Sequence, residues 1–319
     1  MRALITGVAG QDGTLLSQLL LRKNYEVVGL ARSIPTHLRL NLDESKRFTF
    51  IQGDLLEGDD LEYQVKTGGF DEIYNLAAFN SIADSFLKPE LCKNMNVNVP
   101  KRIIETIRKN SLTKVRFFNA ASSEIYSPFS QGPLNENSPT FPESPYGKSK
   151  LEAMRFLNEA RESSEIYISN GILFNHESEY RQEHFFSKKV IKLLTDISRG
   201  NISKLTLNNG NSYRDWGYAA DYTLGMWLSL QSSTPNDYVF ASGVLRSTRE
   251  FIGTAMECLN LTKPIEEIID IDSEIIQSND PRRMIGDPTR AIKQLGWKHT
   301  KNFRQLIEHL VKVEVERIP

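Results

Sequence analysis

Residues 6–13, TGVAGQDG, place three glycines at three-residue spacing directly after the short apolar run RALIT (2–6). The next residues, TLLSQLLLRKN (14–24), put leucines on one face of a helix, and YEVVGLAR (25–32) has the pattern of a second strand. A strand, a glycine turn, a helix and a strand form the unit whose turn holds a dinucleotide pyrophosphate at the helix N-terminus. Because the spacing is G-x-x-G-x-x-G instead of G-x-G-x-x-G, an ordinary tight turn is the alternative.

The dinucleotide expected at this turn is NADP. Gly7 would permit the tight turn, Gly10 the close approach of a phosphate, and Gly13 the close packing of helix on sheet. The second strand ends in GLARS (29–33), without the acidic residue that pairs with the ribose 2′-hydroxyl of NAD. Arg32 is placed to bind the 2′-phosphate of NADP, and the alternative is a solvated surface arginine.

Strand-like and helix-like runs alternate along the first half of the chain. The strand-like runs are FTFIQGD (48–54), EIYNLAA (72–78), VRFFNAAS (115–122) and EIYISNGILF (165–174), and helical runs lie at 59–68, 88–110 and 144–164. This alternation predicts a Rossmann-like, doubly wound parallel α/β sheet. Pro100 lies inside the run 88–110, where it predicts a kink or a break between two helices.

After about residue 175 the pattern loosens into polar loops, short strands and two further helices at 248–260 and 301–317. We expect a dinucleotide-binding Rossmann domain over residues 1–175 and a smaller α/β substrate-binding domain mainly over 176–319. Some of the second half is expected to return to the first domain. Ligands of open α/β sheets lie beyond the carboxyl ends of the strands, so the second domain can close over them.

Composition excludes several classes of protein. The chain has 319 residues, 39% hydrophobic and 25% charged, and a formal net charge of −1. That charge gives no electrostatic case for nucleic acid or an anionic membrane, and the apolar stretches are far shorter than a bilayer span. Met1 leads directly into a strand, so no signal peptide is expected. Cys92 and Cys258 stand far apart without metal-type neighbours, which predicts a cytoplasmic protein without a bound metal.

Catalytic groups are suggested by SPYGKSK (144–150), which places Tyr146 and Lys150 on one face of a helix. An ammonium near a phenol lowers the pKa of the phenol, so Tyr146 is expected to act as a base near neutral pH. In AASSEIY (120–126), which follows a predicted strand, Ser122 or Ser123 can hold a substrate oxygen and Glu124 adds a second acid or base. The alternative for Glu124 is a carboxylate that only orders a turn.

The motifs, taken in order, resemble a known family. They are TGVAGQDG, GDL (53–55), NLAA (75–78), SSEIY (122–126), SPYGKSK, GILFNHES (171–178), RDWG (214–217) and GDPTRAIKQLGW (286–297). Over nearly its whole length the chain resembles the extended short-chain dehydrogenases and, among them, the GDP-mannose 4,6-dehydratase branch, which includes relatives acting on GDP-heptoses. GQDG together with GILFNHES and RDWG is specific to that branch, and Gln11 and Asp12 resemble its form of the NADP-phosphate turn.

The resemblance implies a role for each matching residue. Its catalytic group falls on Ser122, where the family usually has threonine, Glu124, Tyr146 and Lys150. The implied NADP contacts are Gly7, Gly10, Gln11, Asp12, Gly13, Arg32, Asp54, Leu55, Leu76, Ala77, Ala78, Tyr146, Lys150, His176 and Arg181. The implied GDP-sugar contacts are Ser85, Asn175, Lys189 and Arg214. Outside the segment FNHESEYR (174–181), His176 and Arg181 would be interpreted as a structural histidine and a surface ion pair.

The implied reaction is the NADP-dependent 4,6-dehydration of a GDP-hexose, GDP-mannose before others, to the 4-keto-6-deoxy product. Tyr146 would take the proton of the 4-hydroxyl as hydride leaves C4, and Glu124 would remove the acidified C5 proton. Water would leave C6 with a proton from Glu124 or Ser122, and the hydride would return to C6. A GDP-heptose dehydratase, a GDP-4-keto-sugar reductase, epimerase or decarboxylase, and a non-catalytic NADP sensor are the alternatives. The intact Tyr146 and Lys150 pair argues against the sensor.

Some segments depart from the family pattern. The loop SIPTHLRLNLDESKR (33–47) is shorter than its counterpart, which helps to hold NADP and a neighbouring subunit, so a homodimer and a homotetramer both stay open. Gln277 stands where an arginine is expected, and Arg282 or Arg283 would have to compensate. Phe79 and Asn80 replace more polar residues, which keeps a sugar other than mannose open.

Apolar residues on two helical runs bear on assembly. In the superfamily these helices commonly pair with their copies in a four-helix dimer interface, and the alternative is that the residues only cover the sheet. They are Met95, Ile103, Ile104, Met154 and Phe156.

Overall fold

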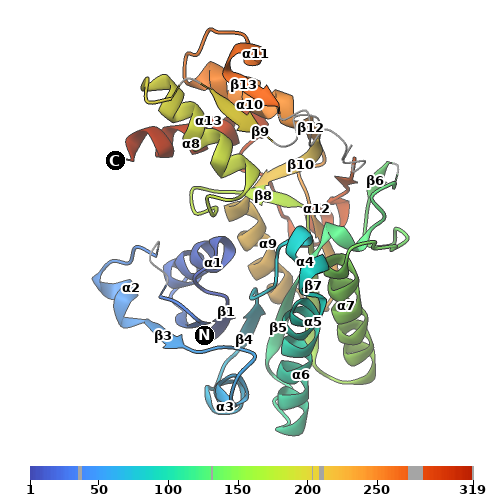
Figure 1. The fold of residues 1–319 in the computed structure, drawn as a ribbon. Helices are drawn as coiled ribbons and strands as arrows, with labels where there is room; N and C mark the ends of the chain where they lie inside the picture. Colours follow the sequence, from blue (N-terminus) through green and yellow to red (C-terminus); the bar gives the residue numbers. More distant parts are fainter. Residues whose placement is uncertain (35–37, 131, 203, 208–211, 272–282, 318–319) are drawn as a thin grey trace.

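The largest element of the protein is a seven-stranded sheet (Figure 1), seen in a computed structural model that describes residues 1–34, 38–130, 132–202, 204–207, 212–271 and 283–317. All neighbouring strands in it are parallel. Their order is β11 (Tyr238–Phe240), β7 (Tyr167–Leu173), β5 (Arg116–Ser122), β4 (Glu72–Asn75), β1 (Arg2–Thr6), β2 (Glu26–Ala31) and β3 (Phe48–Gln52). The predicted doubly wound parallel sheet is confirmed.

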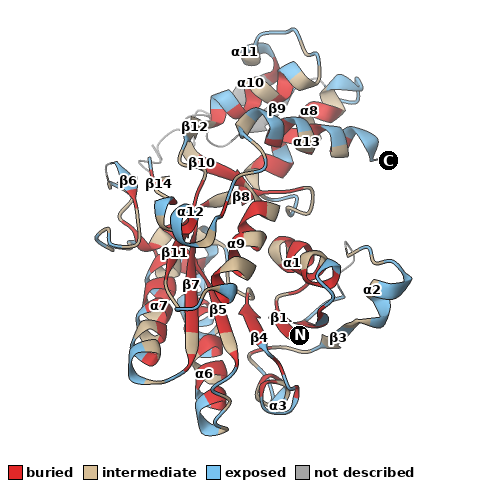
Figure 2. Ribbon diagram, turned by 180° about the vertical axis from the view of Figure 1, so that it is seen from behind, coloured by how far each residue is buried: buried red, intermediate tan, exposed pale blue. Residues whose placement is uncertain are grey.

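Helices cover both faces of this sheet, and Figure 2 shows its central strands buried between them. One face packs against α1 (Gln11–Arg22) and α9 (Ala219–Gln231), and the other against α3 (Asp60–Thr67), α6 (Val99–Lys109) and α7 (Pro145–Ser163). Along β1, Ala3 and Ile5 enter the first core and Leu4 enters the second. A strand that is apolar on both faces needs two helical layers, which is why the sheet is parallel.

A second lobe lies beyond the large sheet, at the top of Figure 1. Its core packs α8 (Phe186–Ser198), α10 (Thr248–Cys258) and α13 (Phe303–Glu316) around Trp216. Its sheets are formed by β8 (Asn175–Glu177), β10 (Tyr213–Tyr218) and β12 (Leu245–Ser247), and by β9 (Leu205–Leu207) and β13 (Ile269–Ile271). Because α9 and β11 return to the large sheet, the second half of the chain serves both lobes; the boundary near residue 175 stays a prediction.

Shorter elements complete the described chain. They are α2 (Leu42–Lys46), α4 (Ile82–Leu87), α5 (Pro89–Lys93), η1 (Asn94–Asn98), η2 (Ser123–Ile125), β6 (Pro133–Leu134), α11 (Ile265–Ile268), β14 (Ile285–Gly286) and α12 (Thr289–Leu295). Over the residues that the structure describes, no helix has the length and apolar character needed to cross a membrane.

The helical run 88–110 is one helix with a wide turn in it. It consists of α5, the π-helical turn η1 and α6, and Pro100 stands in the first turn of α6. Proline has no N–H to donate to a preceding carbonyl, and a π-helical turn is a common way to accommodate the missing hydrogen bond without ending the helix. The expected kink or break is therefore a local widening.

The apolar residues considered for a subunit interface are mostly used inside the chain. Ile103 and Ile104 are fully buried against the large sheet, and Met154 is buried in a neighbouring core. Met95 and Phe156 are partly buried against the same core as Ile103. Their placement supports the alternative that these side chains cover the sheet.

Candidate active site

A cavity of about 410 Å³ lies where β4, β5 and β7 end. All four predicted catalytic residues line it, and so do several of the predicted cofactor and substrate residues. The predicted residues on its wall are Asp12, Leu76, Ala78, Ser122, Glu124, Tyr146, Lys150, Asn175, His176, Arg181 and Arg214. The carboxyl edge of the sheet thus brings together groups that are up to about 200 residues apart in sequence.

The start of α7 puts Tyr146 on the cavity wall. Ser144 caps the helix by accepting a hydrogen bond from the Gly147 amide at 3.0 Å, and Pro145 fills the first position, where its missing N–H costs nothing. A Cβ at Gly147 would lie 2.3 Å from the Glu124 carbonyl oxygen. Only glycine therefore lets the first turn of α7 approach the segment that carries Glu124.

Burial controls the ionisation of Tyr146 and Lys150. The Lys150 ammonium donates to the Ala120 carbonyl at 2.8 Å and lies 5.8 Å from the centre of the Tyr146 ring. Burial lowers the pKa of Lys150 to about 8. Burial also raises the pKa of Tyr146 to about 12, opposed by a hydrogen bond from Ser122. The expectation of a Tyr146 pKa lowered by Lys150 is wrong for this arrangement. Desolvation raises that pKa more than the neighbouring groups lower it, and the largest lowering contribution is the hydrogen bond from Ser122.

Ser122 is the last residue of β5, and Glu124 lies in the short helix η2 that follows it. The Ser122 hydroxyl accepts a hydrogen bond from the Glu124 amide at 3.2 Å, which starts the short helix η2. This local cap keeps the hydroxyl and the carboxylate next to each other on the wall that also holds Tyr146. The wall offers a phenol, a hydroxyl and a carboxylate, which suffices for two separate proton transfers.

The glycine turn fits a bound phosphate. Gly7 has a φ of +73°, and a Cβ on it would lie 2.7 Å from the Ala77 nitrogen. A Cβ on Gly13 would lie 2.5 Å from the Gly7 carbonyl oxygen, so α1 packs directly on the turn. Gly10 has no positive φ, and a Cβ there would come no closer than 3.3 Å to the Gly7 oxygen. The first amides of α1 have no intrahelical acceptor, and they point where the helix dipole favours an anion.

Gln11 and Asp12 join α1 to the start of the second lobe. The Gln11 side chain donates to the His176 carbonyl at 3.1 Å and accepts from the Ser178 hydroxyl at 2.9 Å. The Asp12 carboxylate lies 3.0 Å from Nε2 of His176, whose ring stacks on Tyr222. The Gln11 side chain therefore turns toward the second lobe, and a cofactor role for Gln11 stays a prediction.

Asp12 and His176 favour their charged forms. Burial alone would raise the pKa of Asp12, but the charge and hydrogen bond of His176 outweigh it and lower that pKa. Burial alone would lower the pKa of His176, but Asp12 outweighs it and raises that pKa. The pair is a buried ion pair on the cavity wall.

Arg181 and Arg214 bring positive charge to the same cavity. The Arg181 guanidinium lies 3.1 Å from Glu177 and stacks over the Phe185 ring at 3.6 Å. Arg214 donates to the Tyr213 carbonyl at 2.6 Å. Both side chains are held by neighbours while they face the cavity, an arrangement able to bind a diphosphate.

Other predicted residues lie away from the cavity wall. Ser85 is fully buried, and its hydroxyl accepts from the Tyr146 amide at 3.2 Å. Lys189 is exposed on α8. Asp54 accepts from the Leu56 amide at 3.0 Å, which orders the turn after β3. The predicted ligand contacts of these residues stay predictions.

At the adenine end, Arg32 is exposed just after β2, and its carbonyl accepts from Gln52 at 3.1 Å. Leu55 is buried against the core beneath α3. Gln277 and Arg282 lie outside the described residues. Arg283 is described, and its guanidinium lies 4.2 Å from the centre of the Tyr213 ring.

Asn96 is a residue that the sequence did not indicate. Its side chain accepts from the Phe79 amide at 2.9 Å and donates to the Phe79 carbonyl at 3.1 Å, which fixes the turn after β4. It also donates to Ser149 of α7 at 3.0 Å, and Ser149 donates to the Tyr146 carbonyl at 2.7 Å. The available signal was a polar residue inside a helical run close to Pro100. His184 and Phe185 also line the cavity without having been predicted.

In the part of the chain that is described, no group of three or more His, Cys, Asp or Glu side chains could hold a metal ion.

The fold is that of the extended short-chain dehydrogenases. UDP-glucose 4-epimerase from Thermotoga maritima, solved with UDP-glucose, matches it with a TM-score of 0.85 over 98% of each chain at 19% identity. dTDP-glucose 4,6-dehydratase from Bacillus anthracis, solved with NAD, matches with a TM-score of 0.80 at 20% identity over 98% of this chain and 96% of that one. A Pseudomonas aeruginosa protein solved with NADPH matches with a TM-score of 0.79 at 17% identity over 99% of each chain.

Sequence comparison gives the family. The model of the family described as GDP-mannose 4,6 dehydratase matches residues 4–310. GDP-mannose 4,6-dehydratase of Sinorhizobium fredii is 35% identical over 98% of this chain and 96% of the relative, and that of Drosophila melanogaster is 33% identical over 98% and 86%. The chain belongs to the GDP-mannose 4,6-dehydratase family. This confirms the predicted family and the prediction that the protein is an enzyme of the nucleotide-sugar 4,6-dehydratase class, a hydro-lyase.

Proposed function

We propose that the protein converts GDP-mannose to GDP-4-keto-6-deoxymannose with bound NADP. The observation that carries this is the cavity wall on which the phenol of Tyr146, the hydroxyl of Ser122 and the carboxylate of Glu124 lie together. Oxidation or reduction at one carbon needs a single proton-transfer group, whereas elimination of water across C5 and C6 needs another. Glu124 supplies it, and relatives that are 32% to 35% identical carry the name of this reaction.

The glycine turn and the N-terminus of α1 would hold the NADP pyrophosphate, and Tyr146 and Lys150 would face its nicotinamide half. When bound, the nicotinamide supplies the hydride acceptor for C4 and the hydride donor for C6. Tyr146 would first lose its own proton to solvent when the positively charged nicotinamide binds, and the phenolate then takes the proton of the 4-hydroxyl. Ser122 stabilises the phenolate by donating a hydrogen bond to it.

The remaining proton transfers fall to Glu124 and Ser122. The 4-ketone makes the neighbouring C5 proton acidic, and the Glu124 carboxylate removes it. Glu124 or Ser122 gives a proton to the departing 6-hydroxyl, which leaves as water, and C5 regains a proton as the hydride returns to C6. Arg214 binds the diphosphate of the GDP-sugar and keeps the sugar in place throughout, because a charge-assisted contact does not depend on the oxidation state of the sugar, and Arg181 on the same wall contacts the cofactor.

The test is mass spectrometry of a panel of nucleotide sugars incubated with the enzyme. GDP-mannose should lose one water, with no net change in NADPH absorbance because the hydride returns. Loss of water from a GDP-heptose alone would replace the substrate, and stoichiometric consumption of NADPH would replace dehydration with reduction. An unchanged mass with inversion at C4 would indicate an epimerase.

NADP in preference to NAD rests on Arg32. A charge-assisted contact to the 2′-phosphate exists only in NADP, so Arg32→Ala should weaken NADP binding about 10- to 100-fold and leave NAD binding nearly unchanged. Titration of both dinucleotides by fluorescence measures this. Lys46→Ala, which removes an exposed cation on the neighbouring helix α2, is the control and should change neither affinity. Equal loss for both dinucleotides would refute the choice of NADP.

A homodimer or homotetramer and a cytoplasmic location stay predictions. One surface that could take part in a subunit contact is a groove of about 810 Å³ between α6, α7 and the loop 140–143, where Phe141 is 70% exposed. A monomer by light scattering at micromolar concentration would refute the expected assembly.

A further inference from the structure

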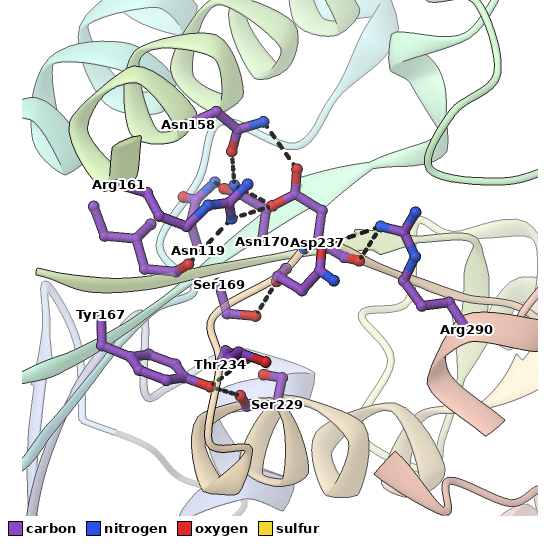
Figure 3. A network of polar contacts seen from close by, with 12 residues as sticks. Asn119, Asn158, Arg161, Tyr167, Ser169, Asn170, Ser229, Thr234, Asp237 and Arg290 are labelled. Carbon is purple, nitrogen blue, oxygen red and sulfur yellow. Dashed lines mark hydrogen bonds and ion pairs between the residues drawn. The ribbon is translucent and has the colours of Figure 1, made fainter. Parts of the chain in front are cut away.

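A row of buried polar side chains crosses the large sheet just before its strands reach the active site. Figure 3 shows one end of this row, at Asn119 and Asn170. Thr6, Asn75, Asn119 and Asn170 stand side by side in the registers β1 to β4, β4 to β5 and β5 to β7. None of the four is more than 4% exposed. We call these four residues the amide row. The layer beneath it, two residues earlier on each strand, is apolar and consists of Leu4, Ile73, Phe117 and Ile168.

The hydrogen bonds of the amide row all run in one direction. Thr6 donates to Asn75, Asn75 donates to Asn119, and Asn119 donates to Asn170, each over 3.0 Å. Hydrogen bonds aligned in this way polarise one another, and in a dry interior each is stronger than in water. The row is therefore one connected unit.

The two ends of the row fix the orientation of every amide in it. At one end the Ala77 backbone amide, which can only donate, donates to the Thr6 hydroxyl at 3.3 Å. At the other end Asn170 donates at 2.9 Å to the carboxylate of Asp237, which as an anion can only accept. With a donor at one end and an acceptor at the other, turning any amide around would place two like groups face to face.

Each end is attached to an element that carries active-site residues. Asp237 accepts from Arg161 at 2.7 Å and from Asn158 at 2.9 Å, and both residues belong to α7, the helix of Tyr146 (Figure 3). Ala77 belongs to the turn after β4, against which Gly7 packs.

The middle of the row, at Asn119, is close in sequence to residues that position the catalytic groups. Asn119 comes one residue before Ala120, whose carbonyl accepts from Lys150 at 2.8 Å, and three residues before Ser122. A shift of β5 by a fraction of a residue would therefore move the acceptor of Lys150 and the hydroxyl of Ser122 together.

We propose that the amide row is a positioning device, which holds the glycine turn, the turn 76–78 and the segment 120–124 in one register and ties them to α7. Apolar side chains at these four positions would fill the interior equally well and would need no hydrogen-bond partners. Buried amides, by contrast, stabilise the fold only when each of their polar atoms has a partner. Directional bonds are useful where register decides the geometry of a site, since a misplacement of about 1 Å can lower a rate about 100-fold. This inference rests on the proposed function for its activity readouts.

Asn119→Asp tests the proposal with almost no change of shape. The aspartate can still accept from Asn75, but its second oxygen faces the carbonyl oxygen of Asn170. Once protonated, that oxygen can donate to Asn170 and the row is complete again. The folded chain therefore favours the protonated aspartic acid and raises its pKa above the unfolded value of about 3.9. The loss of the hydrogen bond to Asn170 is present at high pH and becomes smaller as pH falls toward that unfolded value.

The measurements are kcat, KM and the affinity for NADPH by fluorescence, each taken as a ratio to the wild type. At about pH 8 we expect kcat to fall at least about 10-fold with KM changed less than about 3-fold, and NADPH affinity to fall several-fold; at about pH 5.5 these ratios should approach one. Thr6→Val, which removes only the hydroxyl under the turn 76–78, is the second variant and should lower NADPH affinity several-fold while the protein stays folded.

Two controls separate positioning from stability. Asn110→Asp changes the amide at the C-cap of α6, which donates to the Thr106 carbonyl at 2.8 Å outside the row, and its ratios should not depend on pH. Phe117→Leu thins the apolar layer on the same strand, and it should lower the melting temperature and leave kcat unchanged.

The proposal is overturned if Asn119→Asp lowers the melting temperature as Phe117→Leu does but keeps wild-type kcat and NADPH affinity at every pH. Failure of the proposed function would be recognised by a different observation, because the wild type itself would then release no dehydrated product from GDP-mannose. The NADPH titrations of Asn119→Asp and Thr6→Val would still decide on the amide row in that case.

Discussion

The two sides of the active-site cavity hold their ionisable groups in opposite ways. On the side formed by β5 and α7, burial raises the pKa of Tyr146 to about 12 and lowers that of Lys150 to about 8, so burial favours the neutral form of each group over its charged form. On the side formed by α1 and β8, Asp12 and His176 lie 3.0 Å apart, and each favours the charged form of the other. We call these the neutral side and the paired side.

The difference separates groups that exchange protons from groups that hold charge. Where burial is the main factor that disfavours the charged form of a group, the group can change its ionisation when a ligand brings an opposite charge next to it. A group locked in an ion pair resists such a change and serves as a fixed point of the wall. Removal of a proton-transferring group on the neutral side should therefore change the rate, whereas substitutions on the paired side should change stability alone.

The largest expected effect is that of Tyr146→Phe. Removing the phenol oxygen removes the acceptor for the 4-hydroxyl proton, so hydride transfer should slow by about 100- to 10,000-fold in single-turnover absorbance measurements. Tyr126→Phe is the matched control, because its hydroxyl donates to the Asn135 carbonyl at 2.8 Å away from the cavity, and it should keep the rate. Hydride transfer by Tyr146→Phe within tenfold of the wild type would break the assignment of the neutral side.

Glu124→Gln should stop the reaction at a later point. The first hydride transfer should persist, visible as transient NADPH absorbance, while exchange of the C5 hydrogen with deuterated water falls about 100-fold or more. Glu143→Gln, an exposed carboxylate outside the site cavity, should do neither. If the glutamine variant incorporates deuterium at C5 at nearly the wild-type rate, Glu124 only orders the turn.

Lys150→Met should make the protein more stable at neutral pH, which is unusual for a residue on a catalytic wall. The lowered pKa of Lys150 means that the folded chain holds a disfavoured charge below about pH 8. Between about pH 8 and the unfolded pKa of about 10.4 the wild type gains stability as pH rises. The difference in melting temperature between Lys150→Met and the wild type should therefore narrow by roughly 2 to 4 °C over this range. Lys148→Met, at an exposed position, should show no such trend.

Asp12→Asn should change the melting temperature by a similar amount in the opposite direction, because it should lower stability instead of raising it. A group with a raised folded pKa, here His176, contributes stability that is fully present below its unfolded pKa and is lost as pH rises through the folded one. The variant should therefore melt roughly 2 to 4 °C below the wild type at about pH 6 and closer to it at about pH 9. A loss that grows with pH would contradict the ion pair, and Asp43→Asn on the surface gives the baseline.

The sequence predicted the parts of the molecule that depend on local pattern. The alternation of strand and helix predicted the parallel sheet because each strand is apolar on both faces, as Leu4 and Ile5 show. Motifs predicted the four catalytic residues, and the carboxyl edge of the sheet brings them together at one cavity.

What the sequence could not predict depends on contacts across the fold. The pKa of Tyr146 is governed by burial, which no spacing to Lys150 reveals. The Gln11 side chain takes its direction from Ser178, 167 residues away. The amide row exists only in the register of four strands, and three asparagines in separate strand-like runs carry no mark of it.

The most direct test of the central claim follows a single hydrogen. GDP-mannose carrying deuterium at C4 is incubated with the enzyme and NADP, and the product is examined by mass spectrometry and NMR. An enzyme that dehydrates with return of the stored hydride should release a product that has lost one water and carries the deuterium at C6, with no labelled NADPH accumulating. Deuterium retained at C4 of an unchanged or inverted sugar, or found in free NADPH, would contradict the account.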